Sequence, residues 1–343
     1  MHKITAAELW EVRKNCVILD VRSPGEFNKG HIPGASNLPI FSDDERVSLG
    51  TLYKRINREV AFLEGLDFIG PKLRFFIEET KRLAPNKKIL IHCWRGGLRS
   101  KSMAILLEAA GFSCQLLEGG YKAYRTYCRE VLVDKGAQLI LVGGKTGSGK
   151  TVVLHELIKL QEQVIDLEDL ANHKGSVFGM LGRGKQPTNE QFENNFYDCF
   201  STFDLKKRIW LESESQSIGQ VFIPDKVFRK FRNSPIYLIE RTFEQRIDRL
   251  IDDYGQFQKR DLINAFKKLE KRLGMHHLKA ALGAIEVGDG AIACRIALSY
   301  YDKAYTRSTI ENGFTFATSI STLQMTDKKI AKKLILTAEK NGL

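Results

Sequence analysis

The sequence predicts an α/β protein of two domains, each built around a parallel sheet. The chain has 343 residues, more than the roughly 100–200 residues of a typical single domain. In both halves, short apolar runs typical of buried strands alternate with segments of helical periodicity, a pattern that indicates crossover helices. A polar stretch at 134–136 separates the halves. We therefore expect domains over residues 1–133 and 137–343.

The first domain is predicted to contain three buried strands, at 16–22, 87–93 and 113–117. Helical patterns lie between them, at 72–83 and 100–110. Gly111 follows the second helix at a position typical of a C-cap, which fixes where that helix ends.

The second domain begins as another α/β unit. Apolar strands are expected at 137–143, 164–169, 209–215 and 236–241, with a helix at 152–160. After about Thr242 the sequence becomes rich in helices. The apolar residues of 262–273 recur on one face, which predicts a single amphipathic helix with Leu262, Phe266, Leu269 and Leu273 toward the core.

Composition excludes several classes of protein. Hydrophobic residues make up 43% and charged residues 27%, which is typical of a globular chain. No apolar run reaches the roughly 20 residues of a membrane helix, and the N-terminus lacks a signal-peptide pattern, so we expect a cytoplasmic protein with no membrane partner. The six cysteines form no CxxC pair, which argues against a zinc knuckle or a disulfide framework.

A net charge of +12 favours a polyanionic partner, with nucleic acid as the first candidate. Basic residues are dense over 226–282. Within the predicted amphipathic helix, Lys267, Lys268, Lys271 and Arg272 fall largely off the apolar face. They form a candidate RNA-binding surface, although a solvated basic face without a partner would have the same pattern.

The first candidate site is a cysteine loop between a strand and a helix. Cys93 follows the predicted strand, and Gly96 and Gly97 allow backbone amides to turn toward an anion. The following helix N-terminus favours a thiolate at Cys93, and Arg99 can donate a forked pair of hydrogen bonds to an oxyanion. We include Arg95 among the candidate catalytic residues of this loop.

The second candidate site is a phosphate-binding loop that fits G-x-x-x-x-G-K-[ST] between a strand and a helix. Its members are Gly144, Lys145, Thr146, Gly147, Ser148, Gly149, Lys150 and Thr151. Backbone amides would bind a diphosphate, Lys150 would reach its terminal phosphate, and the hydroxyl of Thr151 could ligate magnesium. Asp166 and Glu212, at the ends of later strands, are candidates to hold or position the metal, with helix capping as the alternative role.

The first half resembles a rhodanese domain. The resemblance rests on the Cys93 loop, on Asp20-Val-Arg22-Ser-Pro-Gly-Glu26-Phe27 with Gly30-His-Ile-Pro-Gly-Ala35, and on Leu117-Glu-Gly-Gly-Tyr121. Five residues separate Cys93 from Arg99, whereas many single-domain rhodaneses have four. The longer loop also fits the HCxxGxxRS pattern of Cys-dependent phosphatases, so a phosphatase stays open for this half.

A rhodanese-like half followed by a P-loop NTPase-like half resembles the family of bacterial tRNA 2-selenouridine synthases. The most specific segments are 93–100 and 143–151, supported by 170–179, 212–219 and Ile223-Pro224. The resemblance implies replacement of sulfur by selenium at the wobble 2-thiouridine of tRNA. It implies selenophosphate as selenium donor and an S-geranyl intermediate made from geranyl diphosphate, with selenium carried on Cys93.

The same resemblance implies that the anticodon arm of tRNA is the macromolecular substrate and that a selenophosphate-supplying enzyme could be a partner. No tightly bound cofactor is expected, apart from magnesium at the phosphate loop. Two other classes remain open on the sequence. One is a sulfurtransferase or Cys-dependent phosphatase fused to a P-loop kinase; the other is a regulatory protein that senses a nucleotide and a phosphoanion.

Overall fold

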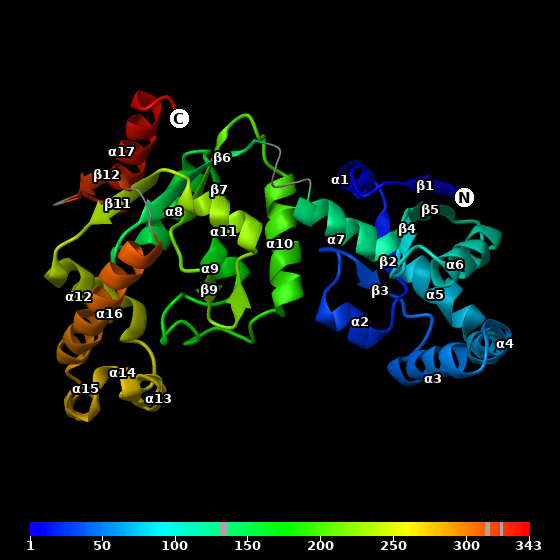
Figure 1. Cartoon of the computed structure of the whole chain (residues 1–343), viewed down its shortest axis with the longest axis horizontal. Helices are drawn as coiled ribbons and strands as arrows, with labels where there is room; N and C mark the ends of the chain where they lie inside the picture. Colours follow the sequence, from blue (N-terminus) through cyan, green and yellow to red (C-terminus); the bar gives the residue numbers. More distant parts are fainter. Residues whose placement is uncertain (131–135, 313–315, 323–324) are drawn as a thin grey trace. The chain divides into compact units, whose positions relative to one another are not determined.

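The computed structural model describes residues 1–130, 136–312, 316–322 and 325–343 (Figure 1). The chain divides into two compact units, residues 1–132 and 133–343. Each unit contains one five-stranded sheet in which every pair of neighbouring strands is parallel. The predicted α/β class with parallel sheets is therefore confirmed.

The sheet of the first unit has the strand order β1-β5-β4-β2-β3. Its strands are β1 (His2–Ile4), β2 (Val17–Asp20), β3 (Ser36–Asn37), β4 (Lys88–His92) and β5 (Ser113–Leu117). Its helices are α1 (Leu9–Val12), α2 (Pro24–Lys29), α3 (Asp43–Arg55), α4 (Arg58–Ile69), the 3-10 turn η1 (Gly70–Lys72), α5 (Leu73–Leu83), α6 (Leu98–Ala109) and α7 (Gly120–Glu130). Each strand predicted for this half is present.

The sheet of the second unit has the order β12-β11-β6-β8-β7. Its strands are β6 (Gln138–Gly143), β7 (Gln163–Ile165), β8 (Arg208–Glu212), β11 (Ile236–Glu240) and β12 (Phe316–Ser321), and β9 (Ser217–Ile218) and β10 (Val221–Phe222) form a separate antiparallel pair. Its helices are α8 (Lys150–Lys159), α9 (Leu167–Leu170), α10 (Asn189–Ser201), α11 (Asp225–Arg232), α12 (Phe243–Tyr254), α13 (Lys259–Lys267), α14 (Glu270–Leu273), α15 (Met275–Val287), α16 (Gly290–Asn312) and α17 (Asp327–Lys340).

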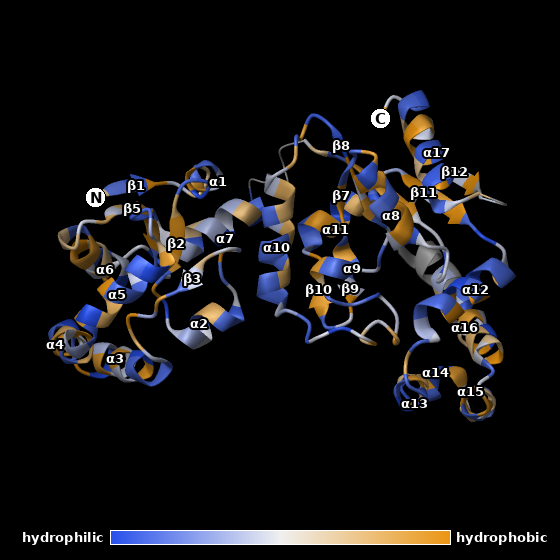
Figure 2. Cartoon of the chain, turned by 180° about the vertical axis from the view of Figure 1, so that it is seen from behind, coloured by the Kyte–Doolittle hydropathy of each residue, from blue (hydrophilic) through white to orange (hydrophobic). Residues whose placement is uncertain are grey.

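Apolar strands and amphipathic helices build a separate core in each unit. In Figure 2, β2 is hydrophobic along its length, whereas α17 alternates hydrophobic and hydrophilic residues. In the first unit, Leu19 of β2 and Ile91 of β4 pack with Leu107 of α6 and are fully buried. In the second, Ile140 of β6 and Trp210 of β8 pack with the helices on the sheet. These cores fix the carboxyl ends of the central strands, from which the site loops emerge.

The prediction of a single helix over 262–273 is wrong, because the structure has two helices there, α13 and α14. The chain turns at Lys268 and Leu269, where the N–H of Leu269 donates to Phe266 O at 2.8 Å instead of continuing the α-helical ladder. Leu269 is fully buried there. The break lets this side chain enter the core that also holds Phe266 and Leu278.

Candidate functional site

The Cys93 loop joins β4 to α6 at the carboxyl end of a central parallel strand. β4 ends at His92, and Gly97 is the N-cap of α6. Among the described residues no side chain caps this helix, so its first N–H groups can receive an anion. The loop is held against α7 because the N–H of Tyr121 donates to Cys93 O at 2.9 Å and that of Lys122 donates to Trp94 O at 2.9 Å.

Two close backbone contacts require glycine in and beside this loop. Gly96 has φ +64°, and a Cβ there would lie 3.0 Å from Leu117 O. Gly120, at the start of α7, has φ +61°, and a Cβ there would collide with Cys93 O. Gly97, in contrast, has φ −92° and open space around its Cα. Of the two loop glycines predicted for the site, only Gly96 is demanded by the backbone, and the structure adds Gly120.

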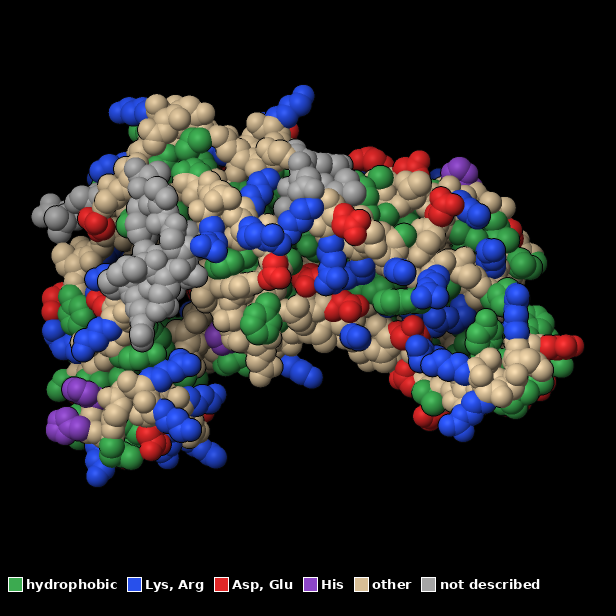
Figure 3. Space-filling model, in the orientation of Figure 1, with side chains coloured by type: hydrophobic (Ala, Val, Ile, Leu, Met, Phe, Trp, Pro, Cys, Tyr) green, Lys and Arg blue, Asp and Glu red, His purple; other side chains and the backbone are tan. Residues whose placement is uncertain are grey.

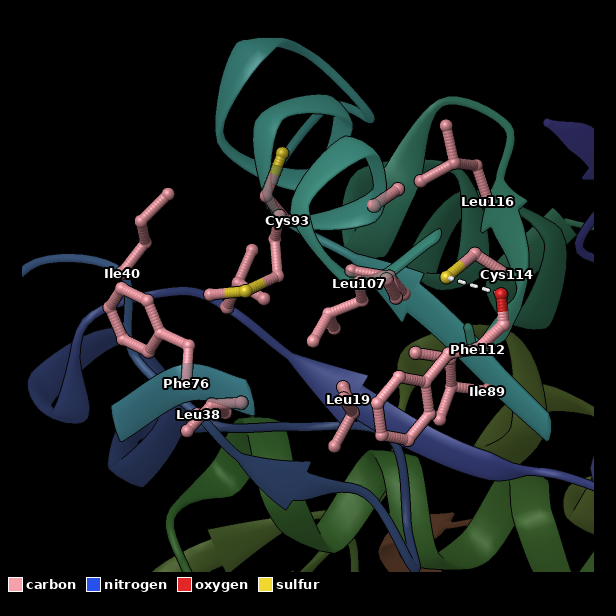
Figure 4. Packing of buried hydrophobic residues seen from close by; sticks show 14 of the residues in the cluster. Leu19, Leu38, Ile40, Phe76, Ile89, Cys93, Leu107, Phe112, Cys114 and Leu116 are labelled. Carbon is pink, nitrogen blue, oxygen red and sulfur yellow. Dashed lines mark hydrogen bonds between the residues drawn. The ribbon is translucent and has the colours of Figure 1, made fainter. Parts of the chain in front are cut away.

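Cys93 is 3% exposed and belongs to the core cluster that contains Ile40, Phe76 and Leu107 (Figure 4). Its Sγ lies 3.3 Å from Oγ of Ser100, whose own hydroxyl donates to Gly97 O at 3.2 Å. The thiol therefore sits at the floor of the loop, with a hydroxyl as its polar neighbour.

Arg99 is fixed by a carboxylate from another part of the unit. Its guanidinium donates to Glu26 Oε2 at 2.6 Å, and Arg46 pairs with the same oxygen at 2.9 Å. Burial raises the pKa of Glu26, but the two arginines outweigh it and hold the pKa below its usual range. Arg95 is exposed in the loop. Glu26 is a positioning residue that the site prediction did not include.

Beneath the loop lies a buried ion pair between Arg22 and Asp20, with a shortest distance of 2.6 Å. Arg22 also stacks 3.8 Å from the ring centre of Tyr121, which connects the pair to the start of α7. Nε2 of His92 lies 3.7 Å from Asp20, and burial lowers the pKa of this histidine. Because an unpaired buried charge is costly, this cluster holds β2, β4 and α7 together under the loop.

The phosphate loop joins β6 to α8 in the second unit and lines a cavity of about 540 Å³. Gly149 is the N-cap of α8 with φ +84°, and Gly144 and Gly147 also have positive φ. A Cβ on Gly144 would lie 2.9 Å from Ile239 O, so β11 approaches too closely for any other residue. These glycines allow successive N–H groups to face one point.

Lys150 and Thr151 face the cavity. Nζ of Lys150 donates to Gly144 O at 3.3 Å and lies 3.6 Å from Oε1 of Glu214. Burial lowers the pKa of Lys150, but the negative charges of Glu214 and Glu168 outweigh this effect and raise the pKa above its usual value. The ammonium therefore stays protonated. Lys145 does not line the cavity, because its side chain points to Asp302 at 3.5 Å.

Three carboxylates surround Lys150 and Thr151. Thr151 Oγ1 donates to Glu168 Oε2 at 2.9 Å, and the N–H of Glu168 donates to Glu212 Oε1 at 2.7 Å. Burial and the charge of Glu214 raise the pKa of Glu168 to about 7. Glu212 is fully buried, its Oε2 has no hydrogen-bond partner among the described residues, and burial raises its pKa well above the usual range.

The structure gives Asp166 the capping role that the sequence left as the alternative. β7 ends at Ile165, and Asp166 accepts the N–H of Asp169 as the N-cap of α9. Its other oxygen bonds Nε2 of His155 at 2.9 Å. The residue of this segment that lines the cavity is Glu168. Neither of the two predicted metal-positioning residues lines the cavity. Glu212 is hydrogen-bonded to the backbone of Glu168, and Asp166 is hydrogen-bonded to Asp169 and His155.

The donor set at Thr151 fits magnesium, which prefers hard oxygen ligands and phosphate oxygens. A hydroxyl and the carboxylates of Glu168 and Glu214 lie on the cavity wall. Within the described ranges, no three His, Cys, Asp or Glu side chains converge as a metal cage. A magnesium ion here would therefore be held by Thr151, Glu168 and the phosphates of the substrate.

Further cations on the cavity wall were not predicted as site residues. Lys174, Arg183 and Arg249 line it. Arg249 pairs with Asp327 at 2.9 Å and approaches the backbone of Gly149 so closely that a Cβ there would meet its guanidinium. Lys174 lies in the segment 170–179 that supports the family resemblance. Arg183 and Arg249 come from segments far from the glycine-rich motif, so no local pattern identifies them.

A second, apolar chamber of about 90 Å³ shares walls with the phosphate cavity. The shared residues are Thr146, Ser176, Leu250, Tyr254 and Tyr301. The chamber extends from them between α12, α13 and α16, where its walls are side chains such as Leu262, Phe266 and Ala297. The phosphate cavity thus opens beside a space suited to a small apolar group.

The four predicted RNA-binding residues, Lys267, Lys268, Lys271 and Arg272, are all exposed. Figure 3 shows several Lys and Arg side chains gathered over the region of α13 to α15. Across the break between α13 and α14, the apolar face points into the core as predicted, since Phe266 is 4% and Leu269 is 0% exposed. Among the described residues, no helix is both long and apolar enough to cross a membrane.

Comparison with known proteins gives matches in both units. Residues 5–127 match the rhodanese-like domain family, and residues 137–323 match the family described as the tRNA 2-selenouridine synthase AAA domain. A tRNA 2-selenouridine synthase of Shewanella denitrificans is 34% identical over 78% of this chain and 78% of its own length. One of Pseudomonas syringae pv. syringae is 31% identical over 84% of this chain and 87% of its own. Among solved structures, a rhodanese-related protein of Thermoplasma volcanium matches with 26% identity and a TM-score of 0.25, over 36% of this chain and 91% of its own.

Proposed function

The chain belongs to the family of tRNA 2-selenouridine synthases, and from this premise we propose that it replaces sulfur by selenium in two steps. In the first step, the wobble 2-thiouridine of a tRNA is geranylated on sulfur by geranyl diphosphate bound at the phosphate loop. In the second, selenium from selenophosphate displaces the geranylated sulfur at the Cys93 loop. Each step uses one of the two anion-binding loops, which lie in different units.

The apolar chamber beside the phosphate cavity is the observation that favours geranyl diphosphate as the donor. A purine in this chamber would need hydrogen-bond partners for its ring nitrogens. Beyond the residues shared with the phosphate cavity, the chamber is lined by apolar side chains and glycines, with the thiol of Cys294 as its one weakly polar group. Burial raises the pKa of that thiol to about 11, so it stays neutral. A diphosphate in the phosphate cavity would place the first part of an attached apolar chain in this chamber.

In the first step the thiouridine sulfur attacks C1 of the geranyl group, the C–O bond breaks, and diphosphate leaves with the bonding electrons. Lys150 and the loop amides stabilise the charge that develops on the leaving oxygen. The loss of the N3 proton keeps the base neutral. Magnesium held at Thr151 would supply further charge stabilisation. No phosphoanhydride hydrolysis is required.

In the second step geranylation has converted the sulfur at C2 into a thiol leaving group. We propose that the phosphate portion of selenophosphate binds the Cys93 loop, near the N-terminus of α6 and Arg99. Selenium attacks C2, the C2–S bond breaks, and geranyl thiolate leaves and takes a proton. Water then cleaves the Se–P bond and releases inorganic phosphate, so electrons balance without an oxidant.

A route through selenium bound to Cys93, as the family resemblance implied, has a different product. If the thiolate attacks selenium and forms an S–Se bond, the electron pair of the Se–P bond stays on phosphorus, which leaves as phosphite. After selenium has attacked C2 and expelled geranyl thiolate, an external thiol must reduce the S–Se bond to release the product and regenerate Cys93. Phosphorus NMR of the products distinguishes the two routes, because phosphate indicates direct attack and phosphite indicates transfer through Cys93.

The decisive experiment is mass spectrometry of the nucleosides of a tRNA that carries 2-thiouridine, after incubation with the protein, geranyl diphosphate and selenophosphate. We expect S-geranyl-2-thiouridine when selenophosphate is omitted and 2-selenouridine when both donors are present. ATP turnover in place of geranyl transfer would support the kinase alternative and contradict the proposal. A tRNA substrate and a cytoplasmic location, with selenophosphate supplied by another enzyme, complete the proposed function.

A further inference from the structure

The first unit contains an apolar cavity of about 830 Å³ that the anion-binding chemistry of the Cys93 loop does not use. It lies between the α3–α4 hairpin and α6. Its volume falls within the range of cavities that hold small-molecule ligands. Its floor includes Ile40 and Phe76, which belong to the core cluster around Cys93 (Figure 4). Met103 of the same cluster also lines it.

One face of α4 forms a wall of this cavity. Arg58, Ala61, Phe62, Gly65, Leu66 and Ile69 line it, which is the spacing of a single helical face. Phe62 and Leu66 on this face are each 48% exposed. Large apolar side chains that line a cavity and remain half exposed indicate that a ligand covers them.

The cavity is continuous with the Cys93 loop through α6. Leu98 and Arg99, the first residues of that helix, line the cavity together with Ser102 and Leu106 further along. Arg99 is also the arginine fixed by Glu26 beside the candidate anion site. A ligand in the cavity therefore has one end within the same loop that we assign to selenophosphate.

The charged residues at the cavity are all basic. Arg46, Lys54, Arg55, Arg58 and Arg99 line it, and no Asp or Glu is among its lining residues within the described first unit. An apolar interior with a cationic rim suits an apolar chain attached to a polyanion. RNA phosphates would contact the rim while the chain enters the cavity.

We propose that this cavity binds the prenyl chain of the S-geranylated tRNA during the second step. The inference rests on the proposed function, which supplies the ten-carbon chain. Because each buried methylene contributes roughly fourfold to affinity, the cavity would hold the intermediate with its C2–S bond at the Cys93 loop. The chain stays in the cavity when selenium attacks, and it leaves as geranyl thiol.

The test uses the full-length protein with selenophosphate and two synthetic anticodon stem-loops. One carries S-geranyl-2-thiouridine and the other S-methyl-2-thiouridine. The variants Leu66→Ser and Phe62→Ser remove apolar surface from the cavity wall. Leu63→Ser is the matched control, because Leu63 is on the same helix and 55% exposed but does not line the cavity.

For the geranylated RNA we expect KM to rise roughly tenfold in Leu66→Ser and Phe62→Ser and to stay unchanged in Leu63→Ser. For the methylated RNA all three variants should match the wild-type protein. Equal KM values for wild type and both wall variants on the geranylated RNA would overturn the inference. So would an equal loss in Leu63→Ser, because it would show that the whole exposed helix contacts a partner.

Failure of the proposed function gives a different result. If the wild-type protein converts neither stem-loop to 2-selenouridine, the second step itself is wrong. If it converts both with the same KM, the reaction stands and the prenyl cavity is rejected. Thermal unfolding of each variant verifies that the α3–α4 hairpin stays folded, and Phe62→Ser provides an independent result should Leu66→Ser be unstable.

Discussion

The hydroxyl of Thr151 donates a hydrogen bond of 2.9 Å to Glu168 Oε2, so the last residue of the phosphate loop is joined to a carboxyl whose pKa is raised to about 7. Burial is the main cause, and the charge of Glu214 adds to it. The fold therefore disfavours the charged form of Glu168, and a cation bound beside it would favour ionisation. Because the pKa of Glu168 is higher in the fold than in the unfolded chain, the free energy of unfolding depends on pH.

We predict that Glu168→Gln stabilises the ligand-free protein at pH 8 but not at pH 4. The pKa rises from 4.5 in the unfolded chain to about 7 in the fold. Between these values the unfolded chain releases a proton that the folded protein retains, so the free energy of unfolding falls as pH increases. The full cost above pH 7 is at most about 3 kcal/mol.

Urea unfolding at pH 4, 6 and 8 measures this difference. The substituted amide removes the titration, so the variant should lose less stability with rising pH than the wild type does. An equal stability difference at all three pH values would contradict the assignment. Glu212 is retained in both proteins, but the charge of Glu168 contributes to its raised pKa, so its share of the slope should also become smaller in the variant.

The sequence predicted both loops because each is a local pattern between a strand and a helix. It could not predict which carboxylate of a pair enters the phosphate cavity. That choice depends on β7 ending at Ile165, so that Asp166 caps α9 and Glu168 reaches Thr151. A strand continued to residue 169 would have given a different alternation of side chains.

The two apolar cavities also could not be predicted from the sequence. The wall of the first-unit cavity includes α4, which carries apolar residues on more than one face, such as Leu63 and Leu66. Such a helix has no single apolar stripe from which to identify a binding face. Arg249 reaches the phosphate loop only because α12 packs near it, which no motif records.

Transfer through Cys93 predicts that Cys93→Ser abolishes formation of 2-selenouridine, whereas direct attack by selenophosphate at the loop predicts that the variant still forms it. On both routes geranylation should stay largely intact, because Cys93 and the phosphate loop lie in separate units. On the route through Cys93, S-geranyl-2-thiouridine should accumulate in the tRNA of cells that carry the variant. Cys16→Ser, at a half-buried cysteine outside the loop, serves as the control and should form 2-selenouridine normally. Unmodified 2-thiouridine alone, with Cys93→Ser folded, would contradict this division between the two steps.

Lys150→Ala is expected to remove geranylation and therefore all later incorporation of selenium. Loss of this charged contact with the leaving diphosphate should cost about 2–4 kcal/mol of transition-state stabilisation. The control is Lys145→Ala in the same loop, since Lys145 points toward Asp302 and is 47% exposed. Single-turnover geranyl transfer measures both variants. Near wild-type transfer by Lys150→Ala would show that the loop serves another ligand.

The last prediction concerns the basic surface of α13 and α14, formed by Lys267, Lys268, Lys271 and Arg272. If these exposed side chains contact tRNA phosphates, replacing all four by Gln should reduce the magnitude of the log–log salt slope by about 3, at roughly 0.7–0.9 per contact. Binding should weaken similarly for every tRNA, because phosphate contacts carry no sequence information. The variant should fold, since the apolar face of the two helices is unchanged.

A filter-binding salt titration tests this surface against a variant with the same change in net charge. Replacing the exposed Lys328, Lys329, Lys332 and Lys340 of α17 by Gln removes four positive charges elsewhere on the same unit. A general effect of net charge would lower affinity in both variants alike. A specific phosphate-binding surface reduces the slope only when the α13–α14 residues are replaced. An unchanged slope in that variant would assign the RNA contacts to another surface, with the basic rim of the first-unit cavity as the next to be substituted.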